Sequence, residues 1–220
     1  MQVKFTTTGA MDFVNVRYVI MFNTSGNGQE PYTNGYQNNY ANYSFAIIVG
    51  GNSTSIAQPV LVEYVGQPGP GGRTVVTPYQ LPTSPQTLQL IPNSNGQNTQ
   101  FTVIFARALF NGLFTPTPPP GGTPAPTPTP VPTPTPTGTS APSPMPTTAS
   151  QAVWNINFFT TDSQGNPLDA PGIGGKSDTS FTFTAPVNTV FDQQFNVSPA
   201  APQAPSPSAQ ILTGQVSNNP

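Results

Sequence analysis

The feature that most constrains the fold of this chain is a stretch of alternating proline and threonine in its middle. Fourteen of the 30 prolines lie between Thr115 and Thr148, and residues 127–137 alternate Thr with Pro apart from Val131. Proline fixes φ and has no amide hydrogen, so this stretch is unsuited to a helix or a sheet interior. It is typical of extended polyproline II, which advances about 3.1 Å per residue. We therefore expect residues 115–150 to be a long disordered or polyproline Pro/Thr spacer.

Both flanks of the spacer carry short apolar runs with the period-two alternation of β-strands. From Phe13 to Phe22 the even positions, Val14 included, form an unbroken apolar row. Residues 106–113, where Ala and Leu cluster, are the one plausible short helix. Further strand-like runs, separated by turns rich in Gly, Pro and Asn, are residues 43–49, 59–65, 74–76, 87–91, 101–107, 152–159, 179–184 and 187–197. This rhythm predicts an all-β fold, an immunoglobulin-like or jelly-roll-like β-sandwich.

The spacer either interrupts one domain or joins two. Residues 151–198 offer only three short strands, near the size below which a chain without cystine or metal rarely folds alone. We therefore expect residues 1–114 to form the first part of a β-sandwich and residues 151–198 to supply the remaining strands of the same sandwich. The alternative is a small second β domain. Residues 199–220 are rich in Pro, Ala, Ser and Gln, and we expect a disordered tail there.

The composition removes most catalytic chemistry. The chain has no His and no Cys, so it lacks a side chain that titrates near neutral pH unaided, a thiolate nucleophile and a zinc-thiolate site. Five Lys and Arg against seven Asp and Glu give a net charge of −2, which cannot neutralise a row of phosphates. We therefore predict that the chain is not an enzyme, has no cofactor and does not bind nucleic acid.

The seven carboxylates are candidates for glycoside hydrolysis and for calcium binding. A glycosidase needs two carboxylates in one cleft, but most of the seven lie in or beside predicted turns. Asp162, Asn166 and Asp169, with Asp178, offer oxygen ligands for calcium. Their spacing departs from the Asp-x-Asp-x-Asp-Gly loop, and a β-turn with Gly165 at positive φ and Asp162 as its cap explains them better. We predict no metal site, with this group as the calcium candidate.

A polar and aromatic segment, residues 30–43, is the candidate binding site. Tyrosine rings stack on sugar faces while amides bond hydroxyl groups, and Tyr and Asn also dominate antibody paratopes. The alternative is that some of these rings only cover one end of the sandwich. The candidate ligand-binding residues are Tyr32, Tyr36, Tyr40, Tyr43, Asn34 and Asn38.

Three features carry resemblances. The Pro/Thr spacer resembles linkers of bacterial secreted and cell-surface proteins, including those that join modules of polysaccharide-degrading enzymes. Residues 162–169 resemble a strand-turn-strand segment of bacterial immunoglobulin-like surface domains. Residues 22–28 and 43–51 resemble uncharacterised bacterial exported proteins. Together the resemblances imply an uncharacterised bacterial exported or cell-surface β-sandwich protein with a Pro/Thr-rich linker, and they imply no specific activity.

The expected location is extracellular or at the cell surface. No apolar run approaches the roughly 20 residues of a transmembrane helix, and residues 1–6 have no apolar signal core. Taken literally this start indicates the cytoplasm, but the spacer, the missing Cys and the scarcity of charge favour export. A leader or lipid anchor would then lie upstream of Met1.

Two functions follow as hypotheses. The first is a non-enzymatic surface protein that binds a neutral polysaccharide, another neutral ligand or another surface protein through residues 30–43. The second is a structural subunit of an extracellular layer or fibre. In that alternative, an apolar strand such as Phe101–Phe105 is an uncovered edge through which copies self-associate.

Overall fold

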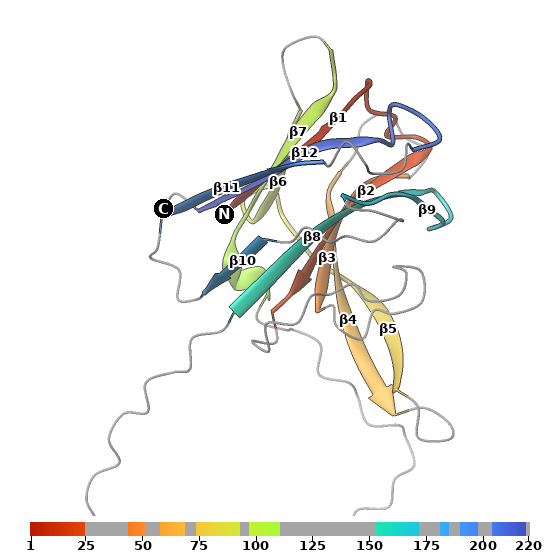
Figure 1. The fold of residues 1–220 in the computed structure, drawn as a ribbon. Helices are drawn as coiled ribbons and strands as arrows, with labels where there is room; N and C mark the ends of the chain where they lie inside the picture. Colours follow the sequence, from red (N-terminus) through yellow and green to blue (C-terminus); the bar gives the residue numbers. More distant parts are fainter. Residues whose placement is uncertain are drawn as a thin grey trace, which may run out of the picture. The chain divides into compact units, whose positions relative to one another are not determined.

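The computed structural model describes residues 1–24, 44–51, 58–68, 74–92, 97–110, 153–171, 181–184, 190–197 and 204–218. The spacer, residues 115–150, lies outside them, so its expected extended form stays a prediction. Met1–Phe114 and Gln151–Pro220 form one compact unit. This unit is all-β and consists of two antiparallel sheets (Figure 1).

The first sheet has five strands in the order β11-β12-β1-β7-β6. Its strands are β1 (Gln2–Thr7), β6 (Leu88–Pro92), β7 (Gln100–Phe105), β11 (Phe191–Asn196) and β12 (Ile211–Asn218). Three of these precede the spacer and two follow it. The sheet therefore depends on residues from both sides of the spacer.

The second sheet has seven strands, in the order β10-β8-β2-β3-β4-β5, with β9 paired to β8. Its strands are β2 (Val16–Asn23), β3 (Phe45–Gly50), β4 (Val60–Pro68), β5 (Thr74–Leu81), β8 (Val153–Asp162), β9 (Pro167–Asp169) and β10 (Phe181–Thr184). The long pairing of β2 with β8, in register from Val16–Asp162 to Asn23–Asn155, again joins the two segments. The plausible helix after β7 is a single 3₁₀ turn, η3 (Arg107–Phe110).

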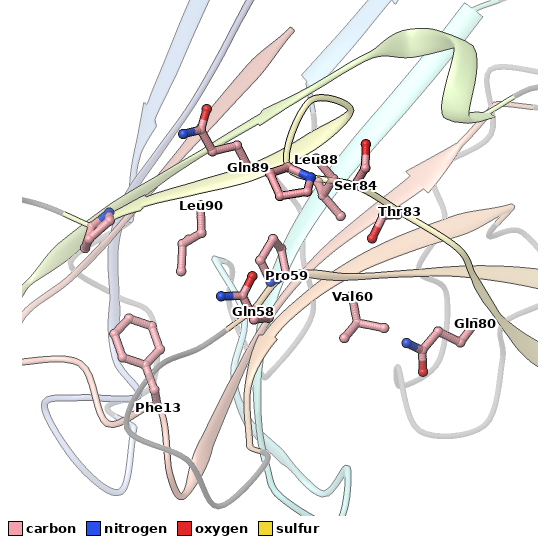
Figure 2. Close-up of a pocket in the computed structure, with 12 residues that line it drawn as sticks. Phe13, Gln58, Pro59, Val60, Gln80, Thr83, Ser84, Leu88, Gln89 and Leu90 are labelled. Carbon is pink, nitrogen blue, oxygen red and sulfur yellow. The ribbon is translucent and has the colours of Figure 1, made fainter.

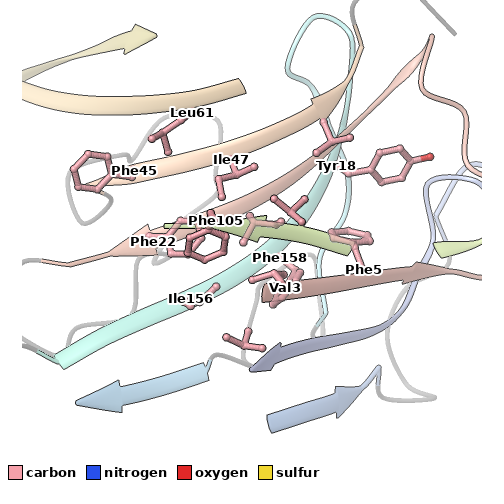
Figure 3. Packing of buried hydrophobic residues seen from close by; sticks show 14 of the residues in the cluster. Val3, Phe5, Tyr18, Phe22, Phe45, Ile47, Leu61, Phe105, Ile156 and Phe158 are labelled. Atoms are coloured by element: carbon pink, nitrogen blue, oxygen red, sulfur yellow. The ribbon is translucent and has the colours of Figure 1, made fainter. Parts of the chain in front are cut away.

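The two sheets pack face to face through aromatic side chains (Figure 3). Phe5 of β1 lies 5.6 Å from Phe158 of β8, centroid to centroid, and both are fully buried. At another part of the core Phe110 of η3 lies 4.7 Å from Phe22 and 5.2 Å from Trp154. Aromatic pairs at these separations add to the free energy of apolar burial. The alternating apolar rows of the sequence therefore supply the core of a β-sandwich.

Strand β2 is buried on both of its faces, which simple alternation does not predict. Its residues Tyr18, Ile20 and Phe22 face the core between the sheets. Val19 and Met21 point to the opposite face and belong to a second buried cluster, completed by Ala46, Phe159 and Ala170. A strand buried on both faces reads as a continuous apolar run, and Val19 to Phe22 is such a run.

The start of β2 differs from the predicted strand. Val14 was expected in the apolar row, but its side chain is 41% exposed and β2 begins at Val16. The Asp12 carboxylate accepts hydrogen bonds from the backbone N–H groups of Val14 and Asn15, each 3.0 Å long. This Asx turn competes with strand pairing, so the chain turns before it enters the sheet.

The predicted disordered tail, residues 199–220, is wrong for residues 204–218. They hold β12, which pairs with β1 on one side and β11 on the other. Ile211 and Val216 of β12 are buried in the core. Its Gly214 allows close packing, because a Cβ there would lie 2.8 Å from Phe195 Cζ and 3.2 Å from Phe158 Cε1. The glycine and the polar outward residues of β12 interrupt its apolar alternation, so the sequence pattern did not predict this strand.

The expected uncovered edge at Phe101–Phe105 is also wrong. These residues belong to β7, which pairs with β1 and with β6. Both sides of the strand are therefore hydrogen-bonded, and Phe101, Val103 and Phe105 are buried. Among the described residues there is no helix long and apolar enough to cross a membrane.

Candidate functional site

The predicted tyrosine-rich site lies outside the described residues. This applies to all six candidates, Tyr32, Tyr36, Tyr40, Tyr43, Asn34 and Asn38. The segment leaves β2 and returns to the neighbouring strand β3. The described residues on either side of it are linked, since Ser44 N–H donates to Phe22 O at 2.8 Å and Thr24 N–H donates to Ser44 Oγ at 3.1 Å.

The calcium candidates serve the local backbone. Asp162 Oδ1 accepts the N–H groups of Gln164 and Asn166, both at 2.8 Å, and Oδ2 accepts Asn166 Nδ2 at 2.6 Å. These bonds, that of Asn166 above all, lower the pKa of Asp162. Gly165 has φ 90°, as the turn interpretation requires. Asp178 lies outside the described residues.

Asp169 does not take part in that turn. Its carboxylate is buried and accepts the N–H of Ile211 at 2.7 Å, and burial raises its pKa. In the described part of the chain no three acidic, His or Cys side chains gather as a metal site would need.

A cleft of about 640 Å³ lies where the two sheets end beside each other. Val60 of β4 and Gln80 of β5 line it from the seven-stranded sheet, and Leu88, Gln89 and Leu90 line it from β6 of the five-stranded sheet. The full lining set adds Phe13, Gln58, Pro59, Thr83, Ser84, Pro85 and Pro92. Figure 2 shows Phe13 and Leu90 directed toward each other from opposite sides of this space.

Backbone turns hold the walls of the cleft. Phe13 lies in the turn that Asp12 caps, and its carbonyl accepts the N–H of Gly51 at 2.8 Å. Gly50 and Gly51 adopt φ of 87° and 69°, values that favour glycine, so β3 ends there as the sequence predicts. On the other side Ser84 N–H donates to Thr87 Oγ1 at 3.1 Å in the connection between β5 and β6.

The chemistry of the cleft is that of an uncharged binding site. Among the described residues that line it, none carries a charge or titrates near neutral pH. Within the described residues, no hydrogen bond engages the side-chain amides of Gln58, Gln80 and Gln89. Each amide supplies donors and an acceptor, and Phe13, Pro59 and Leu90 supply apolar surface. Pockets that combine apolar walls with a few polar groups are typical of small-molecule sites.

Sequence reasoning missed this cleft. Its residues come from the turn before β2, the start of β4, the end of β5, the connection between β5 and β6, and β6 itself. No local sequence pattern predicts this cleft, because glutamine, proline and leucine are common in strands and turns. Comparison with protein-family models, curated proteins and solved structures finds no match to this chain.

Proposed function

We propose that this chain is a non-enzymatic, exported or cell-surface protein of the immunoglobulin-like or jelly-roll-like sandwich class that binds an uncharged ligand, with a glycan as the favoured class. The observation that carries the proposal is the cleft, whose described lining is uncharged and in which Gln58 and Gln80 lie beside apolar residues. A sugar ring offers the complementary groups, since its hydroxyls bond amides and its C–H faces pack on apolar side chains.

The tyrosine-rich residues 30–43 remain part of this proposal as a second contact. Tyr32, Tyr36, Tyr40 and Tyr43 would add stacking platforms, and Asn34 and Asn38 would add amides. The cleft and this segment make separate predictions, so separate variants distinguish them.

The test is a glycan-array screen followed by titration of any positive neutral glycan. The double variant Gln58→Ala with Gln80→Ala should weaken binding at least about tenfold, because two hydrogen bonds worth roughly 1 kcal/mol each are lost. Gln2→Ala is the matched control, since Gln2 is exposed on β1 and does not line the cleft.

The outcomes separate the two contacts. Loss of binding in the cleft variant alone would place the ligand in the cleft, and loss only on replacing the four tyrosines with Ala would place it on residues 30–43. Retention of full affinity by both variants would refute the proposal.

The alternative function, a subunit of a layer or fibre, is not supported by Phe101–Phe105, because this strand lies in the interior of its sheet. Self-association has to be argued from the edges that the sheets do leave open.

A further inference from the structure

The strands at the ends of the two sheets are β6 and β11 in the first and β5 and β10 in the second (Figure 1). The three-residue strand β9, which begins with Pro167, also borders β8 and is too short to offer an edge. In an antiparallel ladder, alternate residues bond the neighbouring strand, and those between them direct N–H and C=O outward. An open row of such groups recruits another strand, and natural edges are commonly closed by proline or by coverage. An edge strand can therefore accept a partner only where its outward residues keep their N–H groups.

The edge of β6 is closed. Ala106 N–H donates to Thr87 O, which sets the odd residues of β6 toward β7 and the even residues outward. Of the outward residues, Leu88 already donates its N–H to Ser84 O at 2.8 Å, and Pro92 has no N–H. Only Leu90 is left as an outward donor in β6.

The edge of β5 is interrupted in the same manner. Tyr64 N–H donates to Ser44 O, so the even residues of β4 bond β3 and its odd residues bond β5. The even residues of β5 then face outward, and Pro78 stands in the middle of them. Strand β10 has four residues and offers two outward positions at most.

The edge of β11 is open among the described residues. Val197 N–H donates to Leu212 O at 3.1 Å, so the odd residues of this strand bond β12. Asp192, Gln194 and Asn196 therefore direct their backbone groups outward, and none is proline. Their side chains are exposed, and no described strand pairs with them. The only charged residue on the strand is Asp192.

We propose that β11 pairs antiparallel with β11 of a second copy of this chain, centred on Gln194. In this register Gln194 lies opposite Gln194 of the second copy, and Asp192 lies opposite Asn196. All three outward residues then form bonded pairs, and an asparagine amide faces each carboxylate. On the core-facing side, Phe191 lies opposite Val197, and both are half-buried apolar residues at the margin of the core.

We expect the pairing strand to come from a second copy of this chain, because β11 paired with itself about Gln194 places compatible side chains opposite each other. The two Asp192 carboxylates stand four residues apart along the pair and do not oppose each other. Such an isologous contact uses the same surface on both copies and closes at two. It joins two five-stranded sheets into one sheet of ten strands, and it does not propagate a fibre. The inference is independent of ligand binding in the cleft.

A single cysteine tests the register directly, because the natural chain has none. In a bonded antiparallel pair the Cα atoms lie about 5.5 Å apart, which suits a disulfide. Gln194→Cys should form a covalent dimer under mild oxidation. Leu212→Cys on the neighbouring strand β12, an exposed position that does not contact Asp192 through a side-chain hydrogen bond, is the matched control and should stay monomeric.

Association without a cross-link is tested by sedimentation over a wide concentration range. One strand pair is a small interface, so the dimer should be weak. Gln194→Pro removes the central outward N–H while leaving the ladder to β12 intact, and should raise the dimer dissociation constant about tenfold. Gln194→Ala keeps that N–H and should not change it. Thermal melting of both variants reports whether the fold is kept.

A charge pair checks the predicted opposition of residues 192 and 196. Asn196→Asp should weaken the dimer by placing two carboxylates opposite each other, and adding Asp192→Lys should restore it. Absence of the Gln194→Cys cross-link, an unaltered dimer in Gln194→Pro, or polymers that grow beyond two copies would each overturn the proposal.

Discussion

At the scale of single residues, Asp169 is the clearest case of a buried charge with a structural task. Its carboxylate accepts Ile211 N–H at the start of β12, and nearby Thr160 Oγ1 donates to Ala209 O at 2.7 Å. Both bonds link the seven-stranded sheet to the chain entering the other sheet. Desolvation by burial outweighs the hydrogen bonds from the backbone N–H groups of Ile211 and Ala170, and it raises the pKa of Asp169.

This raised pKa predicts how stability depends on pH. A carboxyl whose pKa is higher in the folded state binds its proton more tightly there, so its contribution to stability is greatest below the ordinary aspartate pKa of about 3.9. That contribution is lost as pH rises through the folded pKa. Asp169→Asn cannot titrate and keeps an oxygen for Ile211. The free energy of unfolding of the wild type minus that of the variant should therefore fall as pH rises above about 4.

The measurement is denaturant unfolding of both proteins at pH values below and above about 4. Asp12→Asn serves as a contrast, because hydrogen bonding, first that of the Asn15 side chain, lowers the pKa of Asp12. Its contribution has the opposite sign and is lost as pH falls. A wild-type-minus-Asp169→Asn difference that stays constant with pH would contradict the prediction.

At the scale of elements, β12 shows how one missing side chain shapes a strand. Alanine normally suits a strand better than glycine. At position 214, however, the added methyl group would meet the Phe195 and Phe158 rings. Gly214→Ala should therefore destabilise the protein by about 1–3 kcal/mol, the usual cost of overpacking.

The check is equilibrium unfolding of Gly214→Ala beside Thr213→Ala, an adjacent half-exposed position whose change should stay within about 0.5 kcal/mol. Adding Phe195→Leu should recover part of the loss, since the two sites share one contact. Equal effects at positions 213 and 214 would show that the ring contact is not the cause.

The same elements show what can be predicted from the sequence. Where one face of a strand is buried and the other faces solvent, alternation identifies the strand, as for β7, whereas the strand β1 at residues 2–7 was not predicted. Alternation fails for β12, where Gly214 and polar outward residues dilute the pattern, and it misjudges Val14, where the Asp12 turn takes precedence. The cleft arises only when Phe13, Val60 and Leu90 are brought together by the fold, so no local signal precedes it.

At the scale of the whole molecule, each sheet is incomplete without residues from beyond the spacer. Residues 1–114 alone would leave β2 without β8, and would leave the core without Trp154, Ile156 and Phe158. Each large apolar side chain is worth roughly 1.5–3 kcal/mol when buried, and a domain is stable by only about 5–15 kcal/mol. The fragment should therefore not melt cooperatively.

Complementation in trans supplies the control. Residues 151–220 added to residues 1–114 should restore a sharp thermal transition. Residues 151–203 should fail to restore it, because they lack β12. A soluble 1–114 fragment that melts sharply by itself would disprove this interdependence.

The position of Trp154 has a spectroscopic consequence. It is the single tryptophan of the chain, it lies on β8 beyond the spacer, and it is 7% exposed. Its neighbours Phe110 and Arg107, whose guanidinium lies 4.9 Å from the ring centroid, come from before the spacer. Emission from this indole should therefore be blue-shifted only while the two halves of the chain are joined. The fluorescence of Trp154 therefore reports, without an added dye, whether the segments before and after the spacer are packed together.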